Sequence, residues 1–173
     1  MSLMKKLSLI LFSILILLST QISSITSEKT ITGFAKVIDG DSIKINGINI
    51  RLFGIDAFEL KQSCENNMFI WGHCGKESKR FLEDLIDGQR ITCSYREKDR
   101  YGRILGICYH GVYYHNDPLL EINGTMVFAG RAIAYTKYSK RYLELENSAK
   151  KDKAGIWRYG FKETPEQWRR KKK

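Results

Sequence analysis

Proline, histidine and long apolar runs are scarce in this sequence of 173 residues. Two prolines and the lack of a repeat period exclude collagen-like and solenoid architectures. No apolar run reaches the roughly 20 residues that a membrane-spanning helix needs. Hydrophobic residues (43%) and charged residues (28%) occur in proportions typical of globular chains, which excludes a multispanning membrane protein and a disordered tail protein. The length allows one domain.

Basic residues, in contrast, are abundant. The 29 Lys and Arg outnumber the 19 Asp and Glu, and the formal net charge is +10. A basic excess of this size favours a polyanionic partner, such as nucleic acid, an anionic membrane or an acidic polymer.

The N-terminal residues 1–27 have the composition of an export signal. Two lysines precede an apolar stretch at residues 7–18, and mainly small and polar residues follow at 19–27. This order is typical of a secretory signal peptide. We therefore expect cleavage between residues 19 and 27 and a secreted or periplasmic protein, with an uncleaved membrane anchor as the alternative. Residues 28–173 keep 27 of the basic and all 19 acidic residues, so the remaining domain carries a net charge of +8.

The sequence has four cysteines: Cys64, Cys74, Cys93 and Cys108. An even number in an exported chain indicates disulfides, although spacing alone does not choose among the three possible pairings. The chain has no Cys-x-x-Cys pair, and its three histidines lie in no ligand-like spacing. A zinc site is therefore not expected.

The hydrophobic pattern predicts several short strands. We expect them at residues 30–38, 42–45, 48–55, 89–95 and 104–109, with a further short strand at 112–114. Asn46-Gly47, between the second and third of these strands, is a strong signal for a two-residue hairpin. Residues 56–74 show little periodicity and are expected to form a loop.

Helices are expected at residues 75–86 and 120–129, followed by a final helix of about fourteen residues that Ser139 would cap. Antiparallel hairpins without βαβ alternation favour a small closed barrel over a doubly wound sheet. The predicted fold class is α+β, mainly β. We expect one domain over residues 28–160 and a basic tail over 161–173.

Five charged residues fall at or near the ends of predicted strands: Asp41, Arg51, Asp56, Glu59 and Arg103. Carboxylate oxygens suit Ca²⁺ or Mg²⁺, and guanidinium groups suit phosphate. A cation and two arginines could stabilise charge on phosphoryl oxygens while one carboxylate activates water. Each residue alone has a simpler explanation, as a turn, a solvated strand face or a hairpin tip. Only their joint order and spacing favour phosphodiester cleavage.

Six segments carry a more specific pattern: residues 37–42, 51–59, 99–103, 130–135, 143–146 and 154–157. Together they resemble the staphylococcal nuclease (thermonuclease-like) family, in its exported bacterial branch. The resemblance covers about residues 30–160, nearly all of the chain after the expected signal. It implies a five-stranded oligonucleotide-binding (OB-fold) barrel with three helices, which agrees with the hydrophobic pattern.

The resemblance implies a metal site and a base. Asp41 and Asp56 match calcium ligands, and Ala57 matches a position that gives a backbone carbonyl to the metal. Glu59 matches the proposed general base. Phe58 stands where proline is common in the family, a departure that bears on the placement of Glu59.

The resemblance also implies contacts to the nucleic acid. Arg51 and Arg103 match phosphate-binding arginines, and Tyr135 and Tyr138 match nucleotide-site residues. Ser42 replaces the usual threonine after the first acid, which is a mild change.

Two functions follow as expectations. The first is an exported, Ca²⁺-dependent endonuclease that cleaves DNA and RNA by metal-assisted attack of water. The alternative is a non-catalytic OB-fold module that binds single strands by charge and stacking. The complete set of acids and arginines favours the nuclease. We expect a monomer that prefers single strands and has no stable membrane association after signal cleavage.

The hairpin geometry chooses one cysteine pairing. If the hairpin is symmetric about residues 100–101, Cys93 and Cys108 lie opposite each other, within bridging distance. The other two cysteines would then pair and close the loop beside Glu59. Two free core thiols are the alternative.

Overall fold

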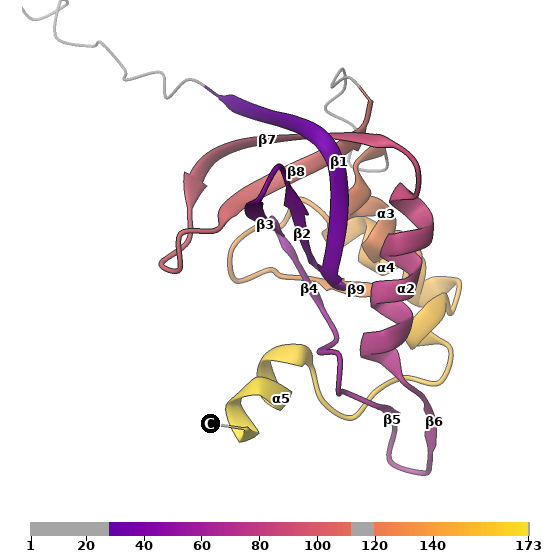
Figure 1. Cartoon of the computed structure of the whole chain (residues 1–173). Coiled ribbons are helices and arrows are strands. Elements are labelled where there is room, and N and C mark those ends of the chain that lie inside the picture. The colour runs from indigo at the N-terminus through magenta and orange to yellow at the C-terminus, as the bar shows by residue number, and fades with distance from the viewer. Residues whose placement is uncertain (1–27, 112–119, 173) are drawn as a thin grey trace, which may run out of the picture.

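A closed barrel of five strands organises the computed structural model in Figure 1, which describes residues 28–111 and 120–172. The strands are β1 (Lys29–Asp39), β2 (Ser42–Ile45), β3 (Ile48–Leu52), β7 (Arg90–Lys98) and β8 (Ile104–His110). Their order around the barrel is β1-β2-β3-β8-β7, and only the β3–β8 pair is parallel. The predicted barrel is confirmed, while the strand expected at 112–114 lies outside the described residues.

The turn between β2 and β3 forms as its sequence predicts. Asn46 and Gly47 both have positive φ, 49° and 81°, and Ile45 pairs with Ile48 across the turn. Two central residues with positive φ are the conformation that Asn-Gly favours in a tight hairpin.

The single strand predicted over residues 48–55 is wrong, because the chain leaves the barrel after Leu52. Gly54 has a φ of +76°, and this left-handed backbone turns the chain away. Strand β4 (Ile55–Ala57) then pairs antiparallel with β9 (Ala132–Ala134) outside the barrel.

The loop predicted over residues 56–74 contains β4 and a small hairpin, so that prediction is also wrong in part. Strands β5 (Cys64–Glu65) and β6 (Ile70–Gly72) pair antiparallel, and a Cys64–Cys74 disulfide closes their base with a Cα–Cα distance of 5.0 Å. Two-residue and three-residue strands are too short to show an alternating pattern.

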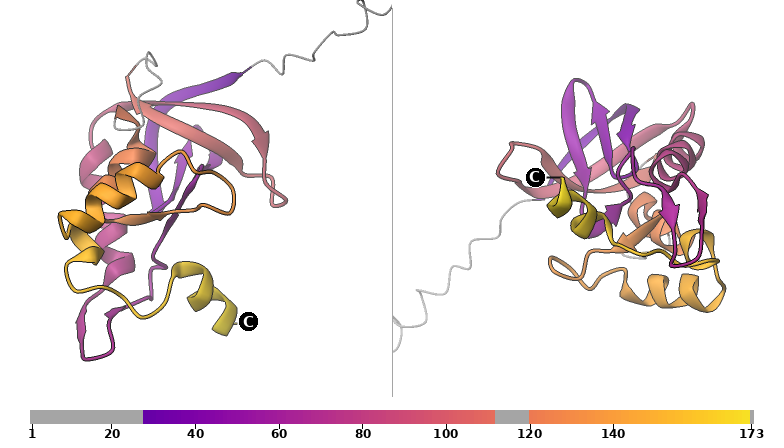
Figure 2. Two further views of the ribbon diagram at one scale, coloured as in Figure 1. Left: turned by 180° about the vertical axis from the view of Figure 1, so that it is seen from behind. Right: turned by 90° about the horizontal axis from the view of Figure 1, so that it is seen from below.

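Helices flank the barrel (Figures 1 and 2): α2 (Cys74–Ile86), α3 (Ile122–Phe128), α4 (Leu143–Lys151), the 3₁₀ helix η2 (Gly155–Trp157) and α5 (Pro165–Lys171). None of the helices in the described ranges is long and apolar enough to cross a membrane. The predicted cap is wrong: α4 begins after Tyr142, and the Ser139 hydroxyl instead accepts from the backbone N–H of Arg141. Helix α5 is an addition to the three expected helices and forms within the segment expected as a tail.

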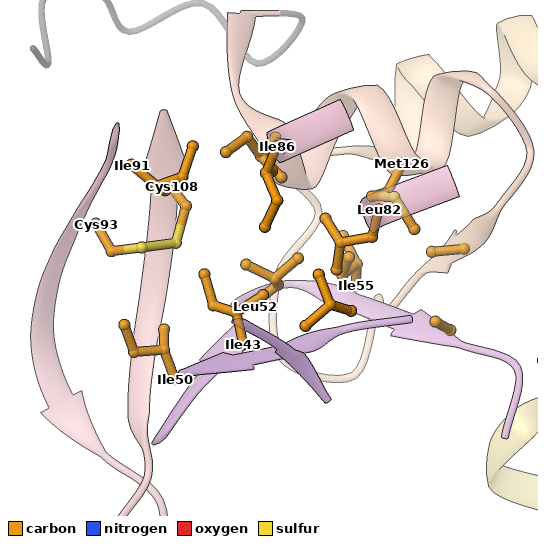
Figure 3. Packing of buried hydrophobic residues seen from close by; sticks show 14 of the residues in the cluster. Ile43, Ile50, Leu52, Ile55, Leu82, Ile86, Ile91, Cys93, Cys108 and Met126 are labelled. Atoms are coloured by element: carbon orange, nitrogen blue, oxygen red, sulfur yellow. A yellow bond between two sulfur atoms is a disulfide. The ribbon is translucent and has the colours of Figure 1, made fainter. Parts of the chain in front are cut away.

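The barrel interior is packed with aliphatic side chains and one disulfide (Figure 3). Ile43 and Ile50 are fully buried and belong to the same core cluster as Leu82 of α2, which Figure 3 shows near Ile55 and Met126. Cys93 and Cys108 lie directly opposite in β7 and β8, bonded to each other with a Cα–Cα distance of 4.0 Å. Both predicted disulfides are therefore present.

A second, smaller core joins the β5–β6 hairpin to the C-terminal segment. Phe58 is 1% exposed and packs edge-on against Phe161, with ring centroids 5.1 Å apart. Ile156 and the Cys64–Cys74 disulfide complete this core. The buried Phe58 side chain thus anchors the chain directly before Glu59, and at the same time it holds the segment that leads into α5.

Candidate active site

The first acidic residue lies at the corner between β1 and β2. The Asp41 backbone N–H donates to the Asp39 carboxylate at 3.1 Å, and the Asp41 carbonyl accepts from the backbone of Leu52 at 2.8 Å. Gly40 has no room for a side chain, since a Cβ there would lie 2.7 Å from the Cβ atoms of both Ala57 and Ser78. The corner is therefore pressed against β4 and α2.

Arg51 of β3 joins two buried acids. Its guanidinium forms ion pairs with Asp41 and, at 2.8 Å, with Asp56 of β4. The second oxygen of Asp41 accepts from the backbone N–H of Ala57 at 2.9 Å. The structure thus brings Arg51 together with all three residues predicted to hold the metal, Asp41, Asp56 and Ala57.

Glu59 follows β4 in a loop that is fixed by hydrogen bonds to the Glu59 backbone. Its N–H donates to the Gln62 side chain at 3.2 Å, and its carbonyl accepts from the Gln62 N–H at 2.7 Å. Gly75 of α2 packs so closely that a Cβ there would lie 1.8 Å from the Glu59 carbonyl oxygen. The loop position depends on this close approach as well as on Phe58.

A third arginine, Arg169 of α5, completes the cluster. Its guanidinium donates to both oxygens of Asp56, each at 3.0 Å, and to the Glu59 carboxylate at 2.8 Å. Glu59 is thereby linked to the acid pair through Arg169.

Arg103 lies immediately before β8, which pairs with β3 and β7 in the barrel. It pairs with Asp99 at 2.7 Å, and its guanidinium carbon is 5.7 Å from the centroid of the Tyr101 ring. The structure places Arg103 on the β7–β8 turn, bound to this local acid rather than to the buried pair.

Two tyrosines follow β9. The Tyr135 N–H donates to the carbonyl of Gly54 at 2.8 Å, which holds Tyr135 beside the start of β4. Its ring meets that of Tyr138 edge-on, with centroids 4.8 Å apart, and Tyr138 is 62% exposed. Burial, with the nearby charge of Asp56, raises the pKa of Tyr135.

Burial raises the cost of ionising the acids of this site. Burial raises the pKa of Asp56, although Arg169 and Arg51 oppose the shift. Burial and then the charge of Asp41 raise the pKa of Asp39 to about 6. Negative charge is therefore costly here, and a cation at this site would lower that cost.

Comparison with known proteins assigns the family. The sequence profile of the family described as "Staphylococcal nuclease homologue" matches residues 49–159. The chain belongs to the staphylococcal nuclease homologue family. It is thus a hydrolase of the nuclease type, and the resemblance seen in its motifs is confirmed.

Individual members of the staphylococcal nuclease family support the assignment. The chain is 33% identical over 171 residues to an "Uncharacterized endonuclease" of Haemophilus influenzae, covering 95% of this chain and 86% of the relative. It is 32% identical over 148 residues to a "Micrococcal nuclease" of Shigella flexneri, covering 80% and 79%. A "Succinoglycan biosynthesis protein ExoI" of Rhizobium meliloti is 35% identical over 134 residues, covering 76% and 67%.

The donor chemistry of this staphylococcal nuclease-like site fits a hard divalent cation. Asp41 and Asp56 are 4% and 1% exposed, and one guanidinium reaches both, so their oxygens are close enough to share a ligand. Carboxylate and carbonyl oxygens are the donors that Ca²⁺ uses. Within the described ranges, no cluster of three or more Asp, Glu, His or Cys residues could hold a metal. A cation would need water or phosphate oxygens in addition.

Sequence reasoning missed three residues that shape the site: Gln62, Gly75 and Arg169. Gln62 and Gly75 act through contacts with the Glu59 backbone, which leave no sequence signature. Arg169 lies 110 residues after Glu59, in the predicted basic tail, whose Trp168-Arg169-Arg170 ending resembles the exported branch of the family but gave no role in the site. Its position in a Trp-Arg-Arg sequence after a helix-starting Thr-Pro was the available signal.

Proposed function

We propose that this protein is an exported, Ca²⁺-dependent endonuclease that hydrolyses phosphodiester bonds of DNA and RNA. The observation that carries the proposal is the pair of buried carboxylates, Asp41 and Asp56, joined by Arg51 and linked to Glu59. A catalytic cation and a base need such neighbouring acids, whereas binding by charge and stacking alone does not.

Each residue has a separate task in this proposal. Asp41, Asp56 and the carbonyl of Ala57 would hold Ca²⁺, which supplies electrostatic stabilisation for charge on the phosphoryl oxygens. Glu59 would accept a proton from the attacking water at its carboxylate, which is 33% exposed and thus open to solvent.

The arginines would neutralise charge as it grows on the phosphate. Arg51 also orients both acids, while Arg103, held by Asp99, presents a second permanent charge from the β7–β8 turn. Nucleic acid is therefore the proposed partner, with bases contacting Tyr135 and Tyr138.

Export rests on the sequence of residues 1–27, which has the order of a secretory signal. The two disulfides agree with an oxidising compartment. We accordingly place the protein outside the cytoplasm, as a monomer without stable membrane association once the signal is cleaved.

The deciding experiment is digestion of single-stranded DNA, duplex DNA and RNA with Ca²⁺, with Mg²⁺ or with a chelator. Cleavage should require Ca²⁺, and Glu59→Gln should slow it by roughly 10²–10³-fold, by analogy with the loss of other groups that stabilise a transition state. Circular dichroism verifies that each variant is folded.

Glu83→Gln is the matched control, because Glu83 is an exposed acid on α2 that pairs only loosely with Lys79 at 3.6 Å. It should cleave as the unaltered protein does. Binding of single strands without cleavage in any metal would instead assign the protein as a non-catalytic module. Full cleavage in excess chelator would remove the cation from the mechanism.

A further inference from the structure

Helix α5 is a short element at the C-terminus that lies beside β4 (Figures 1 and 2). A capping box starts it: the Thr164 hydroxyl accepts from the Gln167 N–H at 3.2 Å, and the Gln167 side chain accepts from the Thr164 N–H at 2.8 Å. A helix of seven residues is unstable alone, so its order depends on contacts with the rest of the protein.

Arg169 supplies the contact at the active site. Its two terminal nitrogens bind both oxygens of Asp56, and one of them also binds Glu59. These are two of the three acids that the proposed mechanism uses. The Arg169 side chain is 33% exposed, so its ion pair with Asp56 is partly shielded from water.

The charge balance shows what a cation would do to this contact. The three acids carry −3 when ionised, and Arg51 and Arg169 carry +2, so the cluster as it stands has a net charge of −1. A divalent cation would bring the cluster to +1 with Arg169 in place, and to neutrality without it. Arg51 and Arg169 already share one buried oxygen of Asp56, so a divalent cation on this carboxylate would add a further repulsion between like charges.

We propose that α5 is a cationic latch, in which Arg169 competes with the divalent cation for Asp56 and at the same time pairs with the proposed base Glu59. The inference rests on the proposed function, because it takes these acids as the cation and base site. Cation binding releases Arg169 and undocks α5. Docked α5 lowers the affinity of the site for the cation by the same factor, since such coupling is reciprocal.

The test measures Ca²⁺ binding by calorimetry on the intact protein, without nucleic acid. Arg169→Gln should bind Ca²⁺ more tightly by roughly 5- to 150-fold, the usual range of coupling between two ligands. Arg170→Gln is the matched control, since Arg170 is 72% exposed in the same helix and pairs with Glu166 at 2.6 Å. Its Ca²⁺ affinity should equal that of the unaltered protein.

Hydrogen exchange of the α5 amides gives a second readout. In the unaltered protein, Ca²⁺ should speed their exchange, and Arg169→Gln should exchange fast with or without Ca²⁺. Slower exchange in Ca²⁺, or an Arg169→Gln variant that binds Ca²⁺ equally or more weakly, would overturn the latch. The second result would make Arg169 a positioning residue for the acids.

The outcomes separate this inference from the proposed function. Ca²⁺-dependent cleavage together with unchanged affinity in Arg169→Gln would refute the latch and leave the nuclease proposal standing. If Arg169→Gln binds Ca²⁺ and the unaltered protein does not, the result would support a latch strong enough to block the site. If neither protein binds Ca²⁺, both the latch and the Ca²⁺ requirement are refuted.

Discussion

A methyl group at position 75 would have no room, although the position lies in the first turn of a helix. Alanine normally stabilises a helix by about 1 kcal/mol relative to glycine. At Gly75 the new Cβ would lie 1.8 Å from the Glu59 carbonyl oxygen and 2.8 Å from the Leu60 Cα. Backbone atoms cannot yield as a flexible side chain would, so the Glu59 loop must move.

We therefore expect Gly75→Ala to destabilise the protein by about 1–3 kcal/mol, the usual cost of overpacking, and to slow cleavage because Glu59 shifts. Urea denaturation measures the first effect and single-turnover cleavage the second. Lys76→Ala, at the exposed neighbouring position, is the control and should change neither. A Gly75→Ala variant with increased stability would show that the loop adapts.

Some residues of the candidate site could be predicted from the local sequence, whereas others depend on contacts between distant segments. Asp41, Asp56 and Arg51 stand in a local strand pattern, and the structure brings them together as their order suggested. Arg169 was not predicted, because an ion pair across 113 residues depends on the packing of Phe161 and the second core rather than on nearby sequence.

At the scale of elements, the two disulfides have different consequences. Cys93–Cys108 joins opposed strands inside the barrel, where both sulfurs are fully buried. Removing this bond with Cys93→Ala and Cys108→Ala should cost about 3 kcal/mol of unfolding free energy, as expected for a loop of this length. The catalytic rate of the remaining folded protein should change little.

Cys64–Cys74 provides the comparison, since it closes the β5–β6 hairpin next to Gly75 and Phe58. Replacing both of its cysteines by alanine should slow cleavage more than the barrel pair does at equal fraction folded. Urea curves and rates measured on the same samples test this. A barrel variant that loses more activity per folded molecule would contradict the assignment.

The elements that the sequence predicted best are those with local signals. Asn46-Gly47 defined one hairpin, and the position of the β7–β8 turn correctly paired Cys93 with Cys108. Ser139 was misread because a serine before a helical pattern also suits a turn, and here it binds the backbone of Arg141. Local rules cannot distinguish these uses, since tertiary packing decides between them.

At the scale of the whole molecule, the basic excess sets how the protein should approach nucleic acid. Residues 28–173 carry a net charge of +8, and many of their lysines and arginines are exposed. Phosphate contacts by such residues release counterions, so binding weakens as salt rises. Stacking on an aromatic ring has no comparable salt dependence, and the two contributions can therefore be separated.

We expect the affinity for single-stranded DNA, measured in chelator to prevent cleavage, to fall steeply and log-linearly with salt. Neutralising about four phosphates would give a slope near −3. Tyr138→Ala removes an exposed ring and should weaken binding by roughly 5- to 150-fold, the equivalent of about 1–3 kcal/mol per stacked base, without changing this slope. Phe34→Ala is the control, because Phe34 is similarly exposed, at 64%, but lies on β1 with the Arg90 guanidinium 5.7 Å from its ring centroid. An affinity independent of salt would refute the electrostatic contribution, and equal losses in both variants would remove Tyr138 from the binding surface.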